Sequence, residues 1–302
     1  MRAEGFASWS IAVGLAVLAL KSLAWHVTGG AALFSDAAES TVNVATAAMM
    51  VGTLFWARRP ADEDHHYGHG KAELFAAVIE GVLIVVAALL IVRHAWEVWR
   101  HPVPLQRPSL GLLFTVLASI VNGVWAKLLI SNGKRLHSPA LRADGRHILA
   151  DVVTSAGVFV GVVLAAETGL RWLDPLVGAL AAAMVLASGF QLIAENVAGL
   201  LDAAPAEDVL AAIRAVLLGI LAEEARDAGS DVFEVHDLRV RRAGHTAFAQ
   251  FHLVVPAAMS VAAAHRICDR MEAALGESMP ALRVTIHVEP EEKAKHRGVA
   301  VS

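Results

Sequence analysis

Cysteine is nearly absent from this 302-residue chain, which has only Cys268. A single cysteine excludes a disulfide framework and a cysteine-rich zinc module. Charged residues are scarce as well, at 18% of the chain, and no block of basic residues points to a nucleic-acid partner. What remains is hydrophobic, at 56% of residues with a mean hydropathy of +0.55, which is above the range of ordinary globular proteins.

Apolar runs long enough to cross a bilayer occur six times, which predicts an all-α membrane domain. The runs cover about 8–27, 31–55, 72–95, 109–130, 139–166 and 175–198. Isolated polar residues inside them, such as Lys21, Glu80, Asn122 and Lys127, are expected to face the bundle interior or lie near a helix end. An even number of spans puts both termini on one side, and a modest bias of lysine and arginine favours the cytoplasm.

Two of the runs carry polar pairs with the same spacing. Glu39 and Asn43 lie four residues apart in one run, and His147 and Asp151 lie four apart in another. Each pair therefore shares one helix face, and an ionisable group at bilayer depth indicates a functional site because it is costly there. Carboxylate, amide and imidazole supply three oxygen donors and one nitrogen, a suitable shell for a divalent metal ion. The pattern predicts a metal site between the two helices.

The two segments also resemble each other, at an offset of 108 residues. Asp, Val and Thr recur in register between 35–46 and 143–154, and the offset carries spans one to three onto spans four to six. Three spans per half invert the second half, a recurrent transporter plan with its substrate site near the midplane. Chance similarity between alanine- and valine-rich helices is the alternative. Asp36 and Asp144, each three residues before a pair, are predicted either to line an access path or to cap or pair locally with nearby arginines.

From about Asp202 the chain changes character, which predicts a division into domains 1–201 and 202–302. The expected elements are a helix at 206–225, strands at 232–241 and 246–255, a helix at 260–277 and a strand at 282–289. This α-β-β-α-β order fits a small α+β sandwich with helices on one face of a sheet. A hairpin turn is predicted at 242–245, and a frayed tail from Glu291.

Two polar clusters lie outside the spans. In the tail, His287 and Glu289 project from one face of the last strand, and the group formed with His236, His252 and His265 predicts a cytosolic metal site, although any single one is more often an ordinary surface histidine. The loop between spans two and three is rich in acids and histidines. There the residues Asp62, His65 and His69 would converge on one metal ion if the segment turned helically, or else belong to a solvated charged loop.

The string Tyr-Gly-His-Gly-Lys-Ala-Glu at 67–73, after that loop and the second span, resembles the signature of the cation diffusion facilitator family. The resemblance extends over almost the whole chain: the six spans, the paired polar positions and the α-β-β-α-β tail. It implies a homodimer in the bacterial inner membrane that exports a divalent transition metal from the cytoplasm in exchange for protons. It also implies a ferredoxin-like, metallochaperone-like tail that binds metal at the dimer interface, and neither enzymatic activity nor a cofactor.

The resemblance assigns roles position by position. The transport site falls on Glu39, Asn43, His147 and Asp151; the loop site on Asp62, His65 and His69; and the tail site on His236, His252, His265, His287 and Glu289. Lys71 and Asp202 match a salt bridge that steadies the dimer in the family, although Lys71 also fits a simple positively charged flank of a span.

The transport site departs from the pattern of zinc members, which usually have His or Asp in place of Glu39 and Asp in place of Asn43. The two remaining carboxylates neutralise a divalent ion without excess. Because an amide cannot titrate, proton coupling falls on the carboxylates and on His147, histidine being the side chain that titrates near neutral pH. The oxygen-rich shell weakens a zinc assignment and leaves manganese, iron and cobalt open, whereas the general order of affinities still favours zinc.

Two other classes of function compete with a transporter. An intramembrane metalloenzyme would need a His-Glu-x-x-His helix or an equivalent base beside the metal, and the sequence contains none. A membrane-anchored metal sensor would make the intramembrane pairs dispensable and would need an output domain, for which the tail ends too soon. We therefore predict a transporter, with the sensor as the alternative.

Overall fold

The computed structural model describes residues 3–57, 59–101, 105–135, 139–229, 232–244, 246–295 and 300–301. His245 of the predicted hairpin turn lies outside these ranges. By its internal contacts the chain forms two units, residues 1–53 with 76–194 and residues 54–75 with 195–302. The predicted domain boundary between residues 201 and 202 stays a prediction.

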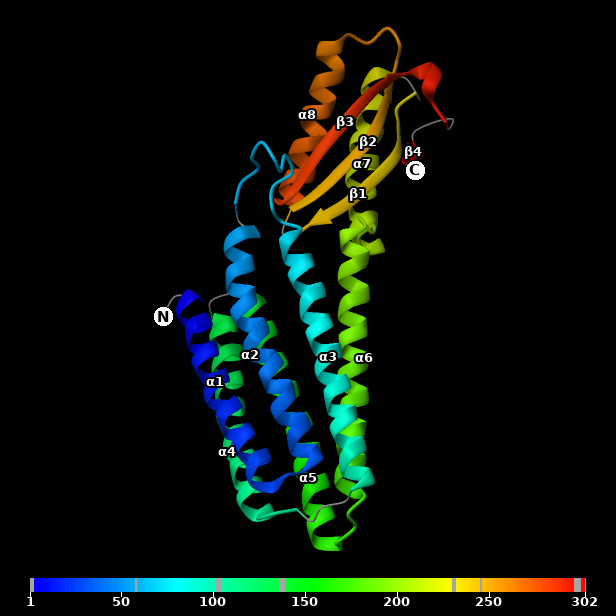
Figure 1. Ribbon diagram of the computed structural model, residues 1–302. Helices are drawn as coiled ribbons and strands as arrows, with labels where there is room; N and C mark the ends of the chain where they lie inside the picture. Colours follow the sequence, from blue (N-terminus) through cyan, green and yellow to red (C-terminus); the bar gives the residue numbers. More distant parts are fainter. Residues whose placement is uncertain are drawn as a thin grey trace. The chain divides into compact units, whose positions relative to one another are not determined.

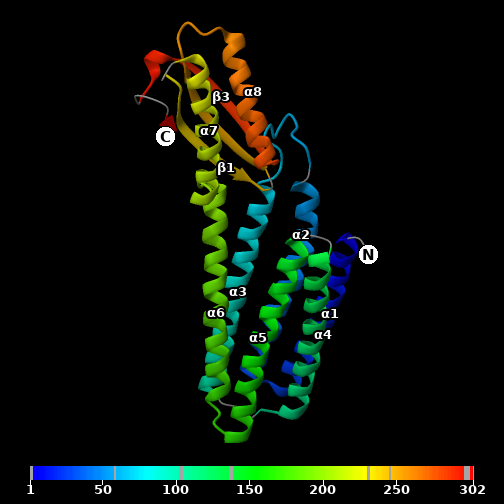
Figure 2. The ribbon, with the colours of Figure 1, turned by 180° about the vertical axis from the view of Figure 1, so that it is seen from behind.

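Six long helices account for the hydrophobic composition (Figure 1). They are α1 (Ala3–Thr28), α2 (Ala31–Ala57), α3 (Ala72–Arg100), α4 (Pro108–Arg135), α5 (Pro139–Thr168) and α6 (Leu173–Leu200). All six are long and apolar enough to cross a membrane, and their bounds agree with the six predicted spans. Sequential helices run antiparallel, so that the start of α1, the end of α4 and the start of α5 lie at one end of the bundle (Figure 2).

Close backbone approach and a long-range cap hold the helices in place. Gly145 of α5 packs on α4, where a Cβ atom would lie only 2.7 Å from Ile130 Cγ1. At the other end of the bundle the carboxylate of Asp174, at the start of α6, accepts hydrogen bonds from the backbone N–H groups of Ala31 (2.6 Å) and Ala32 (3.2 Å). These are N–H groups that the first turn of α2 leaves without a helical partner, so Asp174 caps α2 from another helix.

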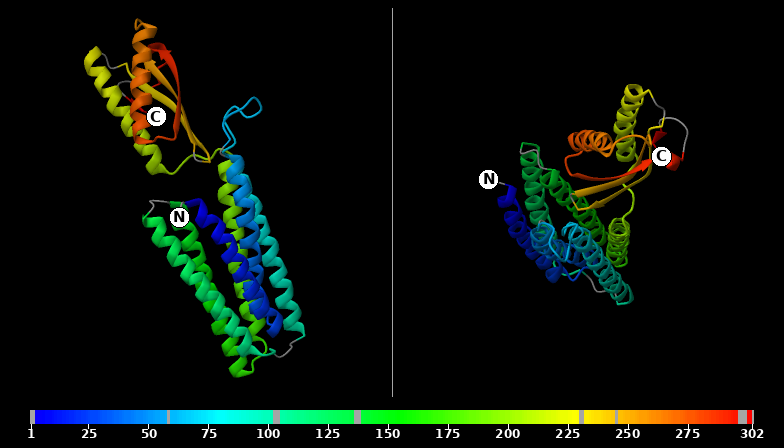
Figure 3. Two further views of the ribbon diagram at one scale, coloured as in Figure 1. Left: turned by 90° about the vertical axis from the view of Figure 1, so that its left-hand side faces the viewer. Right: turned by 90° about the horizontal axis from the view of Figure 1, so that it is seen from above.

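The tail has the predicted α-β-β-α-β order. Its elements are α7 (Glu207–Ala228), β1 (Glu234–Ala243), β2 (Thr246–Val255), α8 (Val261–Ser278) and β3 (Leu282–Pro290). The sheet has the order β3-β2-β1-β4, and both helices lie on one of its faces (Figure 3). Residues 291–302, predicted to be frayed, instead include a 3₁₀ helix (Glu291–Lys293) and β4 (Ala300–Val301), which pairs in parallel with β1. The unpaired backbone groups of an edge strand favour such an addition.

Strand alternation decides which face of the sheet meets the helices. Val235, Phe251 and Leu253 are fully buried in a core that includes Leu217 of α7 and Met271 of α8. Residues between them on each strand point to the opposite, helix-free face. Burying such large apolar side chains stabilises the tail by roughly 1.5–3 kcal/mol for each. The helix-free face is left for polar groups.

Candidate metal sites

A cavity of about 210 Å³ lies among α1 to α5 in the first unit. Its polar lining consists of Ser10, Ser40, Asn43, Thr46, Glu80, Asn122, Asp144, His147 and Asp151. Three of the four predicted transport ligands therefore line one cavity. The fourth, Glu39, is half-buried and interacts electrostatically with Asp151 and His147. Glu80 and Asn122 also face the bundle interior, as predicted.

A direct hydrogen bond joins the two predicted pairs. The amide Nδ2 of Asn43 on α2 donates to Oδ2 of Asp151 on α5, at 2.9 Å. This orientation leaves Oδ1 of Asn43 as the amide atom that a metal ion would bind. Within the described residues, the ligand atoms of Glu39, His147 and Asp151 are not gathered within 4.8 Å of one another. Closure around an ion therefore requires movement of side chains or helices.

Asp36 has a role that neither sequence alternative predicted. Its Oδ1 lies 2.7 Å from Lys21 Nζ on α1 and accepts a 2.8 Å hydrogen bond from Ser155 Oγ on α5. The side chains of Asp36 and Lys21 are each 2% exposed, and Asp36 Oδ2 has no hydrogen-bond partner among the described residues. Asp36 therefore belongs to a buried ion pair. Asp144, in contrast, lines the cavity and accepts a hydrogen bond from Ser10 Oγ (3.1 Å).

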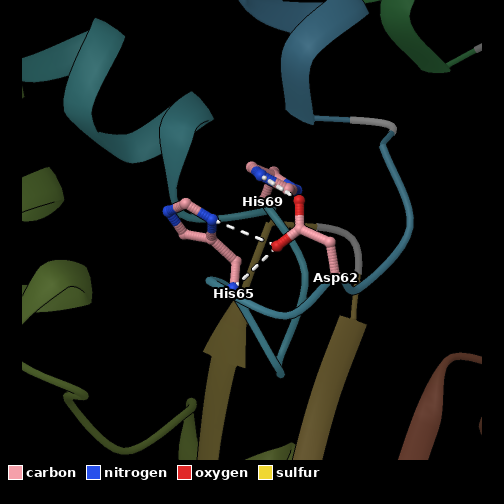
Figure 4. Close-up of side chains that lie close together, drawn as sticks. All are labelled: Asp62, His65 and His69. Atoms are coloured by element: carbon pink, nitrogen blue, oxygen red, sulfur yellow. Dashed lines mark hydrogen bonds and ion pairs between the residues drawn. The ribbon is translucent and has the colours of Figure 1, made fainter.

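The loop before α3 brings its three predicted ligands together without a helix (Figure 4). The two carboxylate oxygens of Asp62 lie 3.3 Å from His65 Nδ1 and 3.4 Å from His69 Nε2. The backbone N–H of His65 donates to Asp62 Oδ1 at 2.7 Å, which curls the loop around the carboxylate. Desolvation raises the pKa of Asp62, but the hydrogen bonds from His65 and the charge of His69 outweigh it and hold the pKa below its ordinary value. The three groups can hold one metal ion.

In the tail, three predicted histidines form a row across the sheet. His236 pairs with His252 between β1 and β2, and His252 pairs with His287 between β2 and β3. Glu289 lies among them: its carboxylate is 3.3 Å from His236 Nε2, 3.3 Å from His252 Nδ1 and 3.7 Å from His287 Nε2. Four of the five predicted tail ligands thus meet on the helix-free face.

His265 does not belong to this row. It lies on α8, which covers the other face of the sheet, is 75% exposed and has its Nε2 3.7 Å from Asp269 Oδ1. The assignment of His265 as a tail ligand stays a prediction, because α8 and the row of histidines lie on opposite faces of the sheet.

Two acidic residues beside the row escaped the sequence analysis. Asp237 sits in a β-bulge with a φ of 54°, where the pairing of β1 shifts, and its carboxylate joins His236 and His252 in a group able to hold an ion. Glu234 is fully buried, with Oε1 3.0 Å from His236 Nδ1, and accepts a hydrogen bond from the backbone N–H of Lys295. Such a partner orients a ligating ring. Its spacing of two from His236 would have revealed Glu234, whereas a bulge leaves no clear sequence signal.

Lys71 and Asp202 are in contact, as the family resemblance implies. Lys71 Nζ lies 2.9 Å from Asp202 Oδ1 and donates to the carbonyl of Leu200 at 3.1 Å, and Arg241 approaches the same carboxylate at 3.6 Å. The hydrogen bond from Lys71, followed by the charges of Lys71 and Arg241, lowers the pKa of Asp202.

This contact makes the free energy of unfolding depend on pH in the acidic range. Because the folded-state pKa of Asp202 is depressed, the contact stabilises the fold above the unfolded-state pKa of about 3.9 and is lost as the pH falls through the folded-state value. We expect Asp202→Asn to lower the free energy of unfolding by at most about 1 kcal/mol at neutral pH, since the pair is partly exposed. The difference from the native chain should shrink as the pH falls below about 3.9 and Asp202 takes up a proton, measured by thermal unfolding of the detergent-solubilised chain. A difference that does not change as the pH falls through the acidic range would contradict the assignment.

The sequence models of two protein domains match this chain. The cation efflux transmembrane domain matches residues 8–201, and the cation efflux protein cytoplasmic domain matches residues 205–291. An uncharacterized transporter from Synechocystis sp. is 40% identical over 293 residues, which cover 97% of this chain and 92% of that protein. The cation-efflux pump FieF of Shewanella oneidensis is 30% identical over 281 residues, 93% of this chain and 92% of the pump. CzrB, solved in a Zn form, is 44% identical over 31% of this chain and 97% of that one, with a TM-score of 0.26.

Proposed function

This chain belongs to the cation diffusion facilitator family of cation-efflux transporters, and from that premise we propose that it exports a divalent transition-metal ion from the cytoplasm in exchange for protons. The ion binds between α2 and α5 at the four predicted transport ligands. The observation that carries this proposal is the hydrogen bond from Asn43 to Asp151 beside a polar cavity in an otherwise apolar bundle.

The chemistry of the ligands supports exchange. The carboxylates of Glu39 and Asp151 balance the charge of a divalent ion, and neutral His147 adds a nitrogen donor. All three must be unprotonated to bind the ion, so metal and protons compete for the same groups. When the site faces outward, protons displace the metal and return with the carrier. Zinc is the first candidate for the ion, with iron, manganese and cobalt as the alternatives.

The cavity also supports a direction of access. It is lined by residues of the N-terminal halves of α1 and α5, such as Ser10 and Asp144, and therefore extends toward the end of the bundle where those helices begin. In our proposal this end faces the cytoplasm, with both termini on that side of a bacterial inner membrane. Packing is dense in the other direction, where Ala24, Leu33 and Val162 belong to a buried apolar cluster.

The tail is proposed to join two copies of the chain and to bind regulatory metal. A row of histidines around Glu289 offers ligands on the helix-free face of the sheet. The contact between Lys71 and Asp202 would steady the dimer near the membrane.

Metal flux into proteoliposomes under an imposed pH gradient tests the proposal. Zn²⁺, Fe²⁺, Mn²⁺ and Co²⁺ are compared with and without an ionophore that collapses the gradient, and protein-free liposomes serve as the control. We expect flux of at least one metal to rise with the gradient and to fall to the protein-free level when the gradient collapses. If no metal moves while the chain still binds metal tightly, the proposal is wrong and a membrane-anchored metal sensor replaces it.

A further inference from the structure

A carboxylate on a third helix lines the transport cavity although no sequence pattern assigned it to the site. Glu80 lies on α3, half-buried, whereas all four predicted ligands lie on α2 and α5. It lines the cavity together with Thr46 of α2 and interacts electrostatically with His147 on α5. Glu80 thus meets both helices that carry the predicted ligands.

Packing of α3 on α6 determines which way Glu80 points. The two helices run side by side (Figures 1 and 2), and the next residue, Gly81, packs against α6. A Cβ atom at Gly81 would lie 2.6 Å from Ile193 Cγ1 and 3.1 Å from the carbonyl oxygen of Gly189. Consecutive residues of a helix are about 100° apart around its axis. With Gly81 held against α6, Glu80 is turned toward α2 and the cavity.

The neighbouring groups on α2 lack the charge that Glu80 supplies. Thr46 is three residues from Asn43 and therefore on the same face of α2, and its hydroxyl donates to the Asn43 carbonyl at 3.2 Å. The side chain of Asn43 is a neutral amide that already donates to Asp151. Glu80 brings a negative charge to this face from across the cavity.

Asp144, the other acidic residue of the cavity wall that is not a predicted ligand, is held differently. Asp144 Oδ2 accepts a hydrogen bond from Ser10 Oγ, which in turn accepts one from Trp125 Nε1 at 3.0 Å. This chain of bonds ties Asp144 to α1 and α4. Of the two cavity acids outside the predicted ligands, Glu80 is the one that lies beside Thr46 of α2 and also interacts with His147.

We propose that Glu80 is an ion-contacting residue of the transport site, and that it supplies the negative charge that Asn43 lacks together with a further oxygen donor. This inference rests on the proposed function. Carboxylate oxygens suit hard divalent ions such as Mn²⁺, whereas Zn²⁺ gains relatively more from the imidazole of His147. Glu80 therefore raises the affinity of the site for Mn²⁺ more than its affinity for Zn²⁺, and so sets the order in which the protein accepts metals.

The test compares metal binding to the full-length chain in detergent, by calorimetry, with gradient-driven flux. Glu80→Gln removes the charge at nearly constant shape, and Glu80→Asp keeps the charge. Glu97→Gln is the matched control, because Glu97 lies on the same helix, is 57% exposed and pairs with Arg93. Asp151→Ala is measured in parallel as the test of the site itself. Since the loop and the tail also offer ligands, each titration is compared with that of Asp151→Ala, in which those clusters are unchanged.

We expect Glu80→Gln to weaken Mn²⁺ binding at the transport site by about tenfold or more and Zn²⁺ binding by clearly less. Glu80→Asp should restore most of the Mn²⁺ affinity, and Glu97→Gln should match the native chain. Equal losses for both metals, no loss for either, or a native chain without measurable Mn²⁺ affinity would each overturn the inference. If Asp151→Ala still abolishes flux in those cases, the proposed function stands; if it leaves flux intact, the transport site itself is wrongly placed.

Discussion

Replacement of Asp151 by alanine is expected to abolish gradient-driven metal flux, with a loss of about 100-fold or more. Asp151 is 8% exposed, lines the cavity and accepts the hydrogen bond from Asn43 that joins α2 to α5. The substitution removes one of the two carboxylates that balance the charge of the ion and one of the groups that exchange protons. Initial rates in proteoliposomes measure the effect for each of the four metals.

Two further variants separate the charge of Asp151 from its packing. Asp151→Asn keeps the size of the side chain and an oxygen that Asn43 can still bond, so it should be as inactive as alanine if the charge matters. Glu167→Ala is the matched control, because it removes an exposed carboxylate from the same helix. Residual flux in Asp151→Ala that still follows the pH gradient would show that the transport site does not depend on Asp151 of α5.

The second large effect concerns stability and involves the buried ion pair. Lys21→Met should lower the free energy of unfolding by about 3–5 kcal/mol, because it leaves the Asp36 carboxylate buried without its cation. The hydrogen bond from Ser155 at 2.8 Å compensates only in part, and Asp36 Oδ2 has no hydrogen-bond partner among the described residues. Thermal unfolding of the full-length chain in detergent measures the loss.

Removal of both charges should be milder than removal of one. The double variant Lys21→Met/Asp36→Leu fills the same space with apolar groups. Replacement of a buried ion pair by apolar groups of similar volume often leaves the free energy of unfolding nearly unchanged. Lys127→Met, which removes an exposed lysine from α4, should leave unfolding nearly unchanged. If the single variant Lys21→Met were as stable as the double variant, the ion pair between Lys21 and Asp36 would not form in the folded protein.

Much of the architecture could be predicted because its causes are local. Apolar runs of sufficient length predict the six spans, and alternation in the tail predicts three strands, whose faces the buried Phe251 and Leu253 then confirm. The spacing of four also places each polar pair on one helix face without knowledge of the fold. The prediction of a frayed tail from Glu291 was wrong, because β4 forms by pairing with the open edge of β1, a strand distant in sequence.

The polar sites depended on contacts that spacing does not report. Asp36 was expected to line an access path, or to cap or pair locally with an arginine such as Arg142 or Arg146. Its partners are instead Lys21 of α1 and Ser155 of α5. Asp62 lies beside two histidines because a backbone N–H group closes a turn around its carboxylate, whereas the spacing alone would have brought the three residues together only in a helix. Asp237 reaches the tail cluster only because a bulge reverses the alternation of β1.

The sequence by itself determined the family, the six spans, the tail fold and the ligand types at the paired positions, since periodicity and spacing act within single elements. Only the tertiary structure decided which polar groups meet. It joined Asn43 to Asp151, buried Asp36 against Lys21 and turned Glu80 into the cavity. The physical reason is that burial of a charge depends on what the neighbouring helices place around it, and helix packing sets those neighbours across more than a hundred residues of chain.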